Sequence, residues 1–316
     1  QELDLVNIQY QPAAYNMNSA AINFLPWRLK GMVKTAVTFH DLRLPYLFPK
    51  AGPLRQTAVN FLARSAHGVI ATNPADYATL ARLLQKDGPD VQTKKKVAQI
   101  AIGSNITVHP TNPIELAEIR RNLGLHPQTV LLGYFGFLNE SKGADTLIEA
   151  LAQLDGRFHL VFIGGQTGAS DRANNQAFLD DLHAQIESLG LAERVHWTGF
   201  LEAAQVSAYL QAADMLVMPY RDGASLRRGT LMASLAHSCP LITTMPQEPA
   251  PQLIAGENCC LVPAGEVSAL AAAVQTVSGD AQLRQKLGQG AARLAGQFSW
   301  EKIAQKTAVF YQSLMT

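Results

Sequence analysis

The chain has 316 residues, 47% of them hydrophobic, and its 26 Lys and Arg residues nearly balance 25 Asp and Glu residues. This length and apolar content suit a globular protein with two cores. The balanced charge gives no reason to expect a nucleic-acid partner. No apolar run is long enough to span a bilayer and no signal peptide opens the sequence. The three cysteines have no metal-ligand spacing and indicate a reducing compartment.

Strand-like apolar runs alternate with helical patterns along the chain, which is typical of βα units and a parallel sheet. In the first block we expect strands at residues 5–10, 34–39 and 68–71, helices at 54–65 and 74–84, and then an extended stretch at 94–102. In the second block we expect strands at 130–135, 159–163, 195–198, 215–218, 240–243 and 260–262, separated by helices. The pattern predicts two Rossmann-like domains joined near Gly103 and Ser104.

The last residues predict an amphipathic helix that begins at Trp300, with Ser299 as its N-cap. Such a helix needs a partner surface for its apolar side. It either packs on its own domain or crosses back onto the first domain.

A glycine turn follows the strand at residues 130–135 and brings Lys142 to a helix start. Gly136 and Phe137 lie at the beginning of this turn, and Gly143 ends it. Ligands of open parallel sheets bind at the carboxyl ends of strands, so the turn is a candidate anion site. Taken alone, an ordinary βα turn with a solvated lysine explains the same residues.

A second polar turn follows the strand at residues 215–218 and also leads into a helix. The helix macrodipole disfavours cations at a helix start, so two arginines there imply a compensating anion, although they are also explained as surface residues. We therefore expect a phosphate site, with Asp222 or Ser225 near a sugar or ribose. Its residues are Tyr220, Asp222, Ser225, Arg227, Arg228, Gly229 and Thr230.

Three weaker signals come from other strand ends. Gly164 and Gly165 let the backbone approach a phosphate or ribose, but a tight βα turn needs the same residues. The loop of Trp197, Thr198, Gly199 and Phe200 offers backbone hydrogen bonds and apolar contact, and its aromatic rings are equally suited to a core. His40 ends the second strand and is either a ligand contact or a loop histidine with a local partner.

The order and spacing of these segments resemble family-four retaining glycosyltransferases, over nearly the whole chain. The segments that carry the resemblance are the Gly133–Gly143 turn, Leu160 to Gly165, Val195 to Leu201, Ala212 to Tyr220, Gly256 to Asn258 and Phe298 to Ala304. The resemblance implies an α/β fold of the GT-B type, a pair of Rossmann-like domains with a donor cleft between them. It implies an N-terminal acceptor-side domain at 1–104, a nucleotide-sugar-binding domain at 105–298 and a C-terminal helix at 299–316. Because the family's N-terminal glycine-rich loop has no counterpart here, we expect the first domain to be incomplete.

The resemblance also assigns roles to residues, and it exposes departures from the family. It implies that His40 faces the donor sugar, that Lys142 stabilises the leaving diphosphate, and that no metal is required. Our own hypothesis is that Arg227 or Arg228 replaces the charge of the family's second cation. The turn at Gly103 and Ser104 corresponds to the interdomain turn. Phe137 stands where the family usually has a second cation, and Ser225 and Ala233 stand where it usually has two glutamates.

The expected function is a retaining glycosyltransferase that moves a sugar from a nucleotide-diphosphate donor to a glycan, lipid or small-molecule acceptor. The expected location is the cytoplasm, including the inner face of the membrane, and exposed sheet edge in an incomplete first domain would favour association between chains. Two alternatives stay open, a nucleotide-sugar epimerase and a non-catalytic sugar- or nucleotide-binding module. The sequence shows no Ser-His-Asp order, P-loop or dinucleotide fingerprint, which disfavours hydrolases, NTPases and dehydrogenases.

Overall fold

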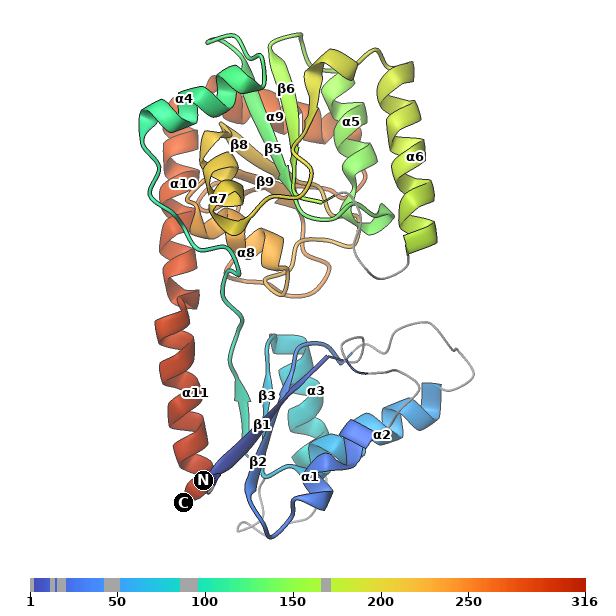
Figure 1. Cartoon of the computed structure of the whole chain (residues 1–316), viewed down its shortest axis with the longest axis vertical. Coiled ribbons are helices and arrows are strands. Elements are labelled where there is room, and N and C mark those ends of the chain that lie inside the picture. The colour runs from blue at the N-terminus through green and yellow to red at the C-terminus, as the bar shows by residue number, and fades with distance from the viewer. Residues whose placement is uncertain (1–2, 12–14, 16–20, 43–51, 86–95, 166–171) are drawn as a thin grey trace. The chain divides into compact units, whose positions relative to one another are not determined.

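The computed structural model describes residues 3–11, 15, 21–42, 52–85, 96–165 and 172–316. The chain divides into two compact units: unit 1 contains residues 1–102 and 300–316, and unit 2 contains residues 103–299. Each unit has its own parallel sheet with helices packed on it (Figure 1). None of the described helices is both long and apolar enough to cross a bilayer.

Unit 1 is built on a four-stranded parallel sheet with the order β1-β2-β3-β4. Its strands are β1 (Leu5–Tyr10), β2 (Lys34–Phe39), β3 (Gly68–Ala71) and β4 (Lys96–Gln99), and its helices are α1 (Leu25–Arg28), α2 (Gly52–Ser65), α3 (Pro74–Gln85) and α11 (Trp300–Met315). Ile8 lies opposite Val37, and Val37 lies opposite Val69. These side chains point to one face of the sheet, where they pack with residues of α2 and α3.

Helix α11 covers the other face of this sheet. Its Phe310 and Leu314 pack against Ala36 and Ile70, which alternate with the residues that face α2 and α3. Gly68 makes this close approach possible, because a Cβ atom there would lie 2.6 Å from the Leu314 Cδ2 atom. The last helix of the chain is therefore part of the core of unit 1.

Unit 2 is built on a six-stranded parallel sheet with the order β10-β9-β8-β5-β6-β7. Its strands are β5 (Val130–Phe135), β6 (Phe158–Ile163), β7 (Val195–Trp197), β8 (Met215–Met218), β9 (Leu241–Thr244) and β10 (Cys260–Val262). Its helices are α4 (Pro113–Asn122), α5 (Ala144–Ala152), α6 (Arg172–Ser188), α7 (Ala203–Ala212), α8 (Gly229–Ala236), α9 (Val267–Gly279) and α10 (Ala281–Ala295).

The helices of unit 2 form two apolar layers on opposite faces of the sheet (Figure 1). One layer packs α5, α6 and α9 on the sheet, and the other packs α7, α8 and α10. The strand order reverses between β5 and β8, which are neighbours in the sheet although they are far apart in sequence. In doubly wound sheets the ligand site lies at this switch point, outside the carboxyl ends of the two strands. The loops that follow β5 and β8 are therefore the place to look for a site.

Candidate functional site: a cation pair at the switch point of unit 2

The loops after β5 and β8 pack directly on each other. Gly143 has a left-handed backbone with φ of 71°, and a Cβ atom there would lie 2.0 Å from the Pro219 carbonyl oxygen. Gly136, with φ of 121°, has no room for a Cβ atom, which would lie 2.6 Å from the Thr230 Cγ2 atom. Only glycine fits such a conformation and such an approach. Lys142 ends a short 3-10 turn, Glu140–Lys142, immediately before Gly143.

The ring of Tyr220 forms the centre of the site. Tyr220 is 1% exposed, and its hydroxyl shares a hydrogen bond of 2.8 Å with the Thr230 hydroxyl. The Lys142 Nζ atom lies 5.4 Å from the centre of this ring, and the Arg228 Cζ atom lies 4.1 Å from it. The π face of an aromatic ring attracts a cation at these distances. One buried ring thus brings together a lysine from the β5 loop and an arginine from the β8 loop.

The charges of the two cations are not fully compensated. Burial, followed by the neighbouring Arg228, lowers the pKa of Lys142 to about 8, and Asp222 opposes this shift. Arg228 forms an ion pair with Asp222, and among the described residues its Nε atom is buried without a hydrogen-bond partner. Burial raises the pKa of Tyr220 to about 12, so its hydroxyl stays protonated near neutral pH. Among the described residues, Asp222 is the carboxylate that acts on both Lys142 and Arg228, and one carboxylate beside two cations suits an anionic ligand.

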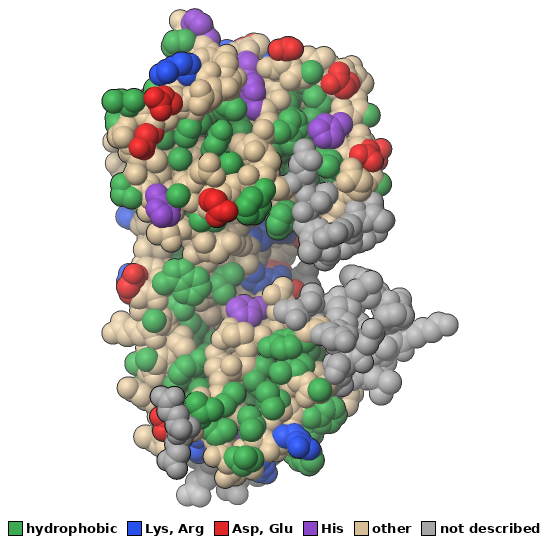
Figure 2. All heavy atoms as spheres, in the orientation of Figure 1, with side chains coloured by type: hydrophobic (Ala, Val, Ile, Leu, Met, Phe, Trp, Pro, Cys, Tyr) green, Lys and Arg blue, Asp and Glu red, His purple; other side chains and the backbone are tan. Residues whose placement is uncertain are grey.

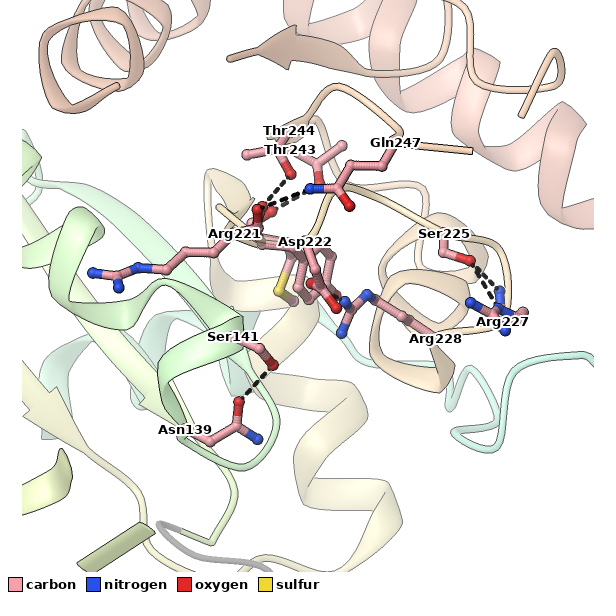
Figure 3. A network of polar contacts seen from close by, with 12 residues as sticks. Asn139, Ser141, Arg221, Asp222, Ser225, Arg227, Arg228, Thr243, Thr244 and Gln247 are labelled. Carbon is pink, nitrogen blue, oxygen red and sulfur yellow. Dashed lines mark hydrogen bonds and ion pairs between the residues drawn. The ribbon is translucent and has the colours of Figure 1, made fainter. Parts of the chain in front are cut away.

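The two adjacent arginines point in different directions. Figure 3 shows Arg228 and Asp222 extending toward each other, whereas Arg227 lies beside Ser225. Arg227 also lies 4.0 Å from a carboxylate oxygen of Glu248. Arg228 occupies the N-cap position of α8, and Gly229 is the first helical residue, with Asn105 packed against it. Of the two candidate arginines, the structure places Arg228 beside Lys142.

A further ion-pair cluster, which the sequence did not reveal, joins the same two loops. The Arg221 guanidinium contacts Asp145 and lies 3.3 Å from a carboxylate oxygen of Glu140. The Arg221 amide also donates a hydrogen bond of 3.0 Å to the Ser141 carbonyl oxygen. The β8 loop is therefore fixed against the turn that carries Lys142. The partners are 76 and 81 residues apart in sequence, and no local pattern signals such a contact.

The glycine turn after β6 lies against the loop after β7. Gly164 forms a bridge with Gly199, and its amide donates a hydrogen bond of 3.0 Å to the Thr198 hydroxyl. The Trp197 ring stacks on Phe162 at 4.4 Å and packs against the core, whereas Phe200 is 80% exposed. This loop offers polar backbone groups and one exposed ring.

Phe137 is 54% exposed, and one edge of its ring lies near Gly165, where an added Cβ atom would be 3.4 Å away. The β5 and β6 turns are thus in contact through this ring. Gly103 is buried, and the Ser104 hydroxyl donates to the Ile106 carbonyl oxygen at 2.7 Å. This contact orders the start of unit 2.

The two positions that resemble the family's glutamate sites hold no carboxylate. Ala233 is completely buried in the core beneath α8, and the Ser225 hydroxyl accepts a hydrogen bond of 3.4 Å from the Arg227 amide. Asp222, the nearest acidic side chain in sequence, pairs with Arg228. Within the described ranges, no group of three or more His, Cys, Asp or Glu residues is arranged to hold a metal ion.

His40 belongs to unit 1, directly after β2. Its Nε2 atom lies 2.8 Å from the Gln9 Oε1 atom, and burial lowers its pKa below the usual value. Its amide donates a hydrogen bond of 3.0 Å to the Tyr10 carbonyl oxygen. The histidine is held by the ends of two neighbouring strands.

Comparisons with known proteins agree with this architecture. The chain is 28% identical to a D-inositol 3-phosphate glycosyltransferase of Jonesia denitrificans, over 69% of this chain and 51% of the relative. It is 26% identical to the lipopolysaccharide core biosynthesis mannosyltransferase LpsB of Rhizobium meliloti, over 89% of this chain and 76% of the relative. The chain spans about half the length of the inositol-phosphate relatives that it matches.

Solved structures have the same fold. Anabaena Alr3699/HepE in complex with UDP and glucose superposes with a TM-score of 0.76 at 24% identity, over 98% of this chain and 78% of that one. Sucrose-phosphate synthase from Thermosynechococcus elongatus gives a TM-score of 0.75 at 22% identity, over 98% and 73%. The sequence model of the family "Glycosyl transferases group 1" matches residues 129–280, which include the turn with Lys142 and the loop with Arg228. The chain therefore has the GT-B fold, and its residues 129–280 are a glycosyl transferases group 1 domain.

Proposed function

We propose that this chain transfers a sugar from a nucleotide-diphosphate donor to an acceptor, with retention of configuration at the anomeric carbon. The observation that carries the proposal is the convergence of Lys142 and Arg228 on the ring of Tyr220. In such a transfer the bond between the sugar and the diphosphate breaks, and negative charge develops on the departing phosphate. Positioned cations stabilise that charge most effectively where water is largely excluded.

In this proposal the two cations share the work of a leaving-group clamp. Lys142 supplies a compact charge, and the guanidinium of Arg228 supplies directed hydrogen bonds once it turns from Asp222 to the phosphate. Because protein cations carry the leaving-group charge, the proposed reaction requires no metal ion. We therefore expect the affinity for the donor to be the same with and without a chelator.

The remaining donor contacts are proposed from the loops around this clamp. Gly136, Gly164 and Gly165 would let the backbone approach the ribose and phosphates, and Thr198, Gly199 and Phe200 would contact the nucleobase. Since the Trp197 ring faces the core, a contact from Trp197 would use its backbone. His40 is proposed to hydrogen-bond the donor sugar, and this role rests on the family resemblance alone.

A second candidate function is a binding module without turnover. The observation in its favour is the absence of a carboxylate at Ser225 and Ala233, the positions where related transferases hold the donor. The two functions share the diphosphate site and differ in the products. Release of free nucleoside diphosphate from a nucleotide sugar, measured with and without candidate acceptors, distinguishes a transferase from a module that only binds.

The donor-site proposal is tested by thermal shift and calorimetry with UDP, GDP, ADP and their sugars. We expect at least one diphosphate to raise the melting temperature of the wild-type chain. Lys142→Ala and Arg228→Gln are each expected to weaken its binding by about tenfold to a hundredfold, since each removes a charge-assisted contact.

Lys286→Ala is the matched control, because Lys286 is an exposed lysine on α10. It is expected to bind the diphosphate as the wild type does. No stabilisation by any diphosphate, or equal affinity in the Lys142 and Lys286 variants, would contradict the proposal.

A further inference from the structure

The nearly neutral chain contains two units of opposite charge. Unit 1 carries 14 Lys and Arg residues against 7 Asp and Glu residues, whereas unit 2 carries 12 against 18. The overall charge of +1 conceals this asymmetry. Strong positive charge on one unit is a physical signal for an anionic partner.

The positive charge of unit 1 coincides with exposed apolar side chains in one short segment. Phe24 is 43% exposed, Trp27 57% and Met32 78%, and Arg28 and Lys30 between them are exposed as well. We call these five residues the α1 patch. The sequence has no Asp or Glu between Asp4 and Asp41. In Figure 2, hydrophobic side chains gather around α1 and α2 with Lys or Arg side chains among them.

The segment that carries the patch is fixed to the rest of unit 1 by buried residues and hydrogen bonds. Pro26 and Asn23 are buried, and the Asn23 amide group donates a hydrogen bond of 3.2 Å to the Tyr10 hydroxyl. Consecutive turns close the backbone, with hydrogen bonds from the Leu29 amide to the Leu25 carbonyl and from the Met32 amide to the Leu29 carbonyl. The exposed rings therefore do not result from a frayed end.

We infer that the α1 patch docks unit 1 onto an anionic lipid bilayer. Tryptophan and other large apolar side chains enter the interfacial region of a bilayer, and lysine and arginine beside them attract anionic headgroups. Among anionic partners, a bilayer fits better than a nucleic acid because the patch combines its two cations with three large apolar side chains. The patch belongs to unit 1 and the proposed diphosphate site belongs to unit 2, and the role of the patch does not depend on the proposed donor.

The test is co-sedimentation of the full chain with vesicles. We expect binding to vesicles of phosphatidylcholine with phosphatidylglycerol, and much weaker binding to phosphatidylcholine alone. Binding should fall as salt is raised, because screening weakens the headgroup attraction. The double variant Arg28→Gln, Lys30→Gln is expected to lose roughly 25-fold in partitioning, about fivefold for each cation.

The second test is the double variant Trp27→Ser, Met32→Ser. It should bind anionic vesicles more weakly than the wild type, while Arg28 and Lys30 still attract the anionic headgroups. The fluorescence of Trp27 should shift to shorter wavelength on binding, and Trp27→Phe should remove that shift. The control triple variant changes exposed residues of unit 2, Ile114→Ser, Arg121→Gln and Lys286→Gln, and should bind as the wild type does.

Equal binding to neutral and anionic vesicles would overturn the inference, as would an equal loss in the control triple variant. Binding to a single-stranded oligonucleotide that needs Arg28 and Lys30 but not Trp27 would also overturn it, in favour of a nucleic acid. Stabilisation by nucleoside diphosphates, measured on the α1 variants, should match the wild type. The experiments can therefore contradict the membrane inference without contradicting the diphosphate site, and the reverse.

Discussion

Without a bound ligand, the buried charge of Lys142 lowers the stability of the folded protein. Its pKa falls from 10.5 to about 8, so the folded state holds the proton less tightly than the unfolded chain does. Below pH 8 the charged lysine opposes folding in full, and the penalty fades as the pH rises toward 10.5. A lysine that costs stability at a strand end is expected where the cation serves binding.

We predict that Lys142→Met is more stable than the wild type below pH 8 and that this advantage disappears near pH 10.5. Denaturant unfolding of both proteins across this range measures the difference. A nucleoside diphosphate should raise the pKa of Lys142 again, so binding to the wild type at a pH of about 9 should take up close to one proton. Calorimetry in buffers of different ionisation enthalpy detects this uptake. Equal uptake by the Met variant would contradict the assignment.

Asp222 competes with an anionic ligand for Arg228. The ion pair holds the guanidinium in the ligand-free site, and an incoming phosphate has to replace the carboxylate. We predict that Asp222→Asn binds a nucleoside diphosphate about fivefold to tenfold more tightly at pH 7, which is about 1 to 1.4 kcal/mol. Calorimetry with the diphosphate alone measures this gain. Weaker binding by the Asn variant would show that Asp222 supports the ligand instead of competing with it.

At the scale of elements, the site depends on two loops that meet backbone to backbone. Gly143 separates the 3-10 turn of Lys142 from α5, and its left-handed conformation brings it against the Pro219 carbonyl. A side chain at this position would push the β5 and β8 loops apart and separate Lys142 from Arg228.

We predict that Gly143→Ala destabilises the protein by on the order of 3 kcal/mol and abolishes binding of a nucleoside diphosphate, because strain and overlap add. Gly156→Ala is the control, since no atom lies within 4 Å of a Cβ atom there and its φ is not positive. Thermal unfolding and calorimetry measure both effects. A stable Gly143→Ala protein with normal binding would show that the two loops tolerate separation.

The elements themselves were largely predictable from the sequence. The strands at residues 5–10, 34–39, 68–71 and 130–135 agree with the structure residue for residue, because buried parallel strands are short apolar runs bounded by turns. The strand expected at 240–243 is shifted by one residue to Leu241–Thr244, since strand ends depend on pairing with neighbours that the local sequence does not contain.

The site was predictable only in part. The turn after β5 showed that a lysine would lie at a strand end, but Lys142 ends a 3-10 turn and is not the start of α5. The sequence could not show which of Arg227 and Arg228 lies beside Lys142, because the backbone angles of the loop set the direction of each side chain. The contacts of Arg221 with Asp145 and Glu140 depend on the packing of distant loops. Roles in binding a donor stay predictions.

At the scale of the whole molecule, unit 1 is assembled from both ends of the chain. The Asn7 side-chain amide donates a hydrogen bond of 2.5 Å to the Tyr311 hydroxyl, and Phe310 and Leu314 fill the core beneath α11. Unit 2 is contiguous, and its two apolar layers are formed from residues 103–299 alone.

We predict that Phe310→Ala destabilises unit 1 by about 3 kcal/mol through the cavity that it leaves, while unit 2 is unaffected. Hydrogen exchange measured separately over the two sheets checks this expectation. Val309→Ala is the control, because Val309 is 61% exposed on the same helix. Equal loss of protection in both sheets would show that the units unfold together.

The return of α11 to the first sheet also sets an order of assembly during synthesis. A ribosome makes all of unit 2 before it makes helix α11, which covers the second face of β1 to β4. Until then Ala36 and Ile70 have no helix on them, and the first sheet presents an open apolar face to water. Of the two units, unit 1 therefore begins to be translated before unit 2 and completes its core after it, so chaperones that bind exposed apolar sheets have more time to act on unit 1.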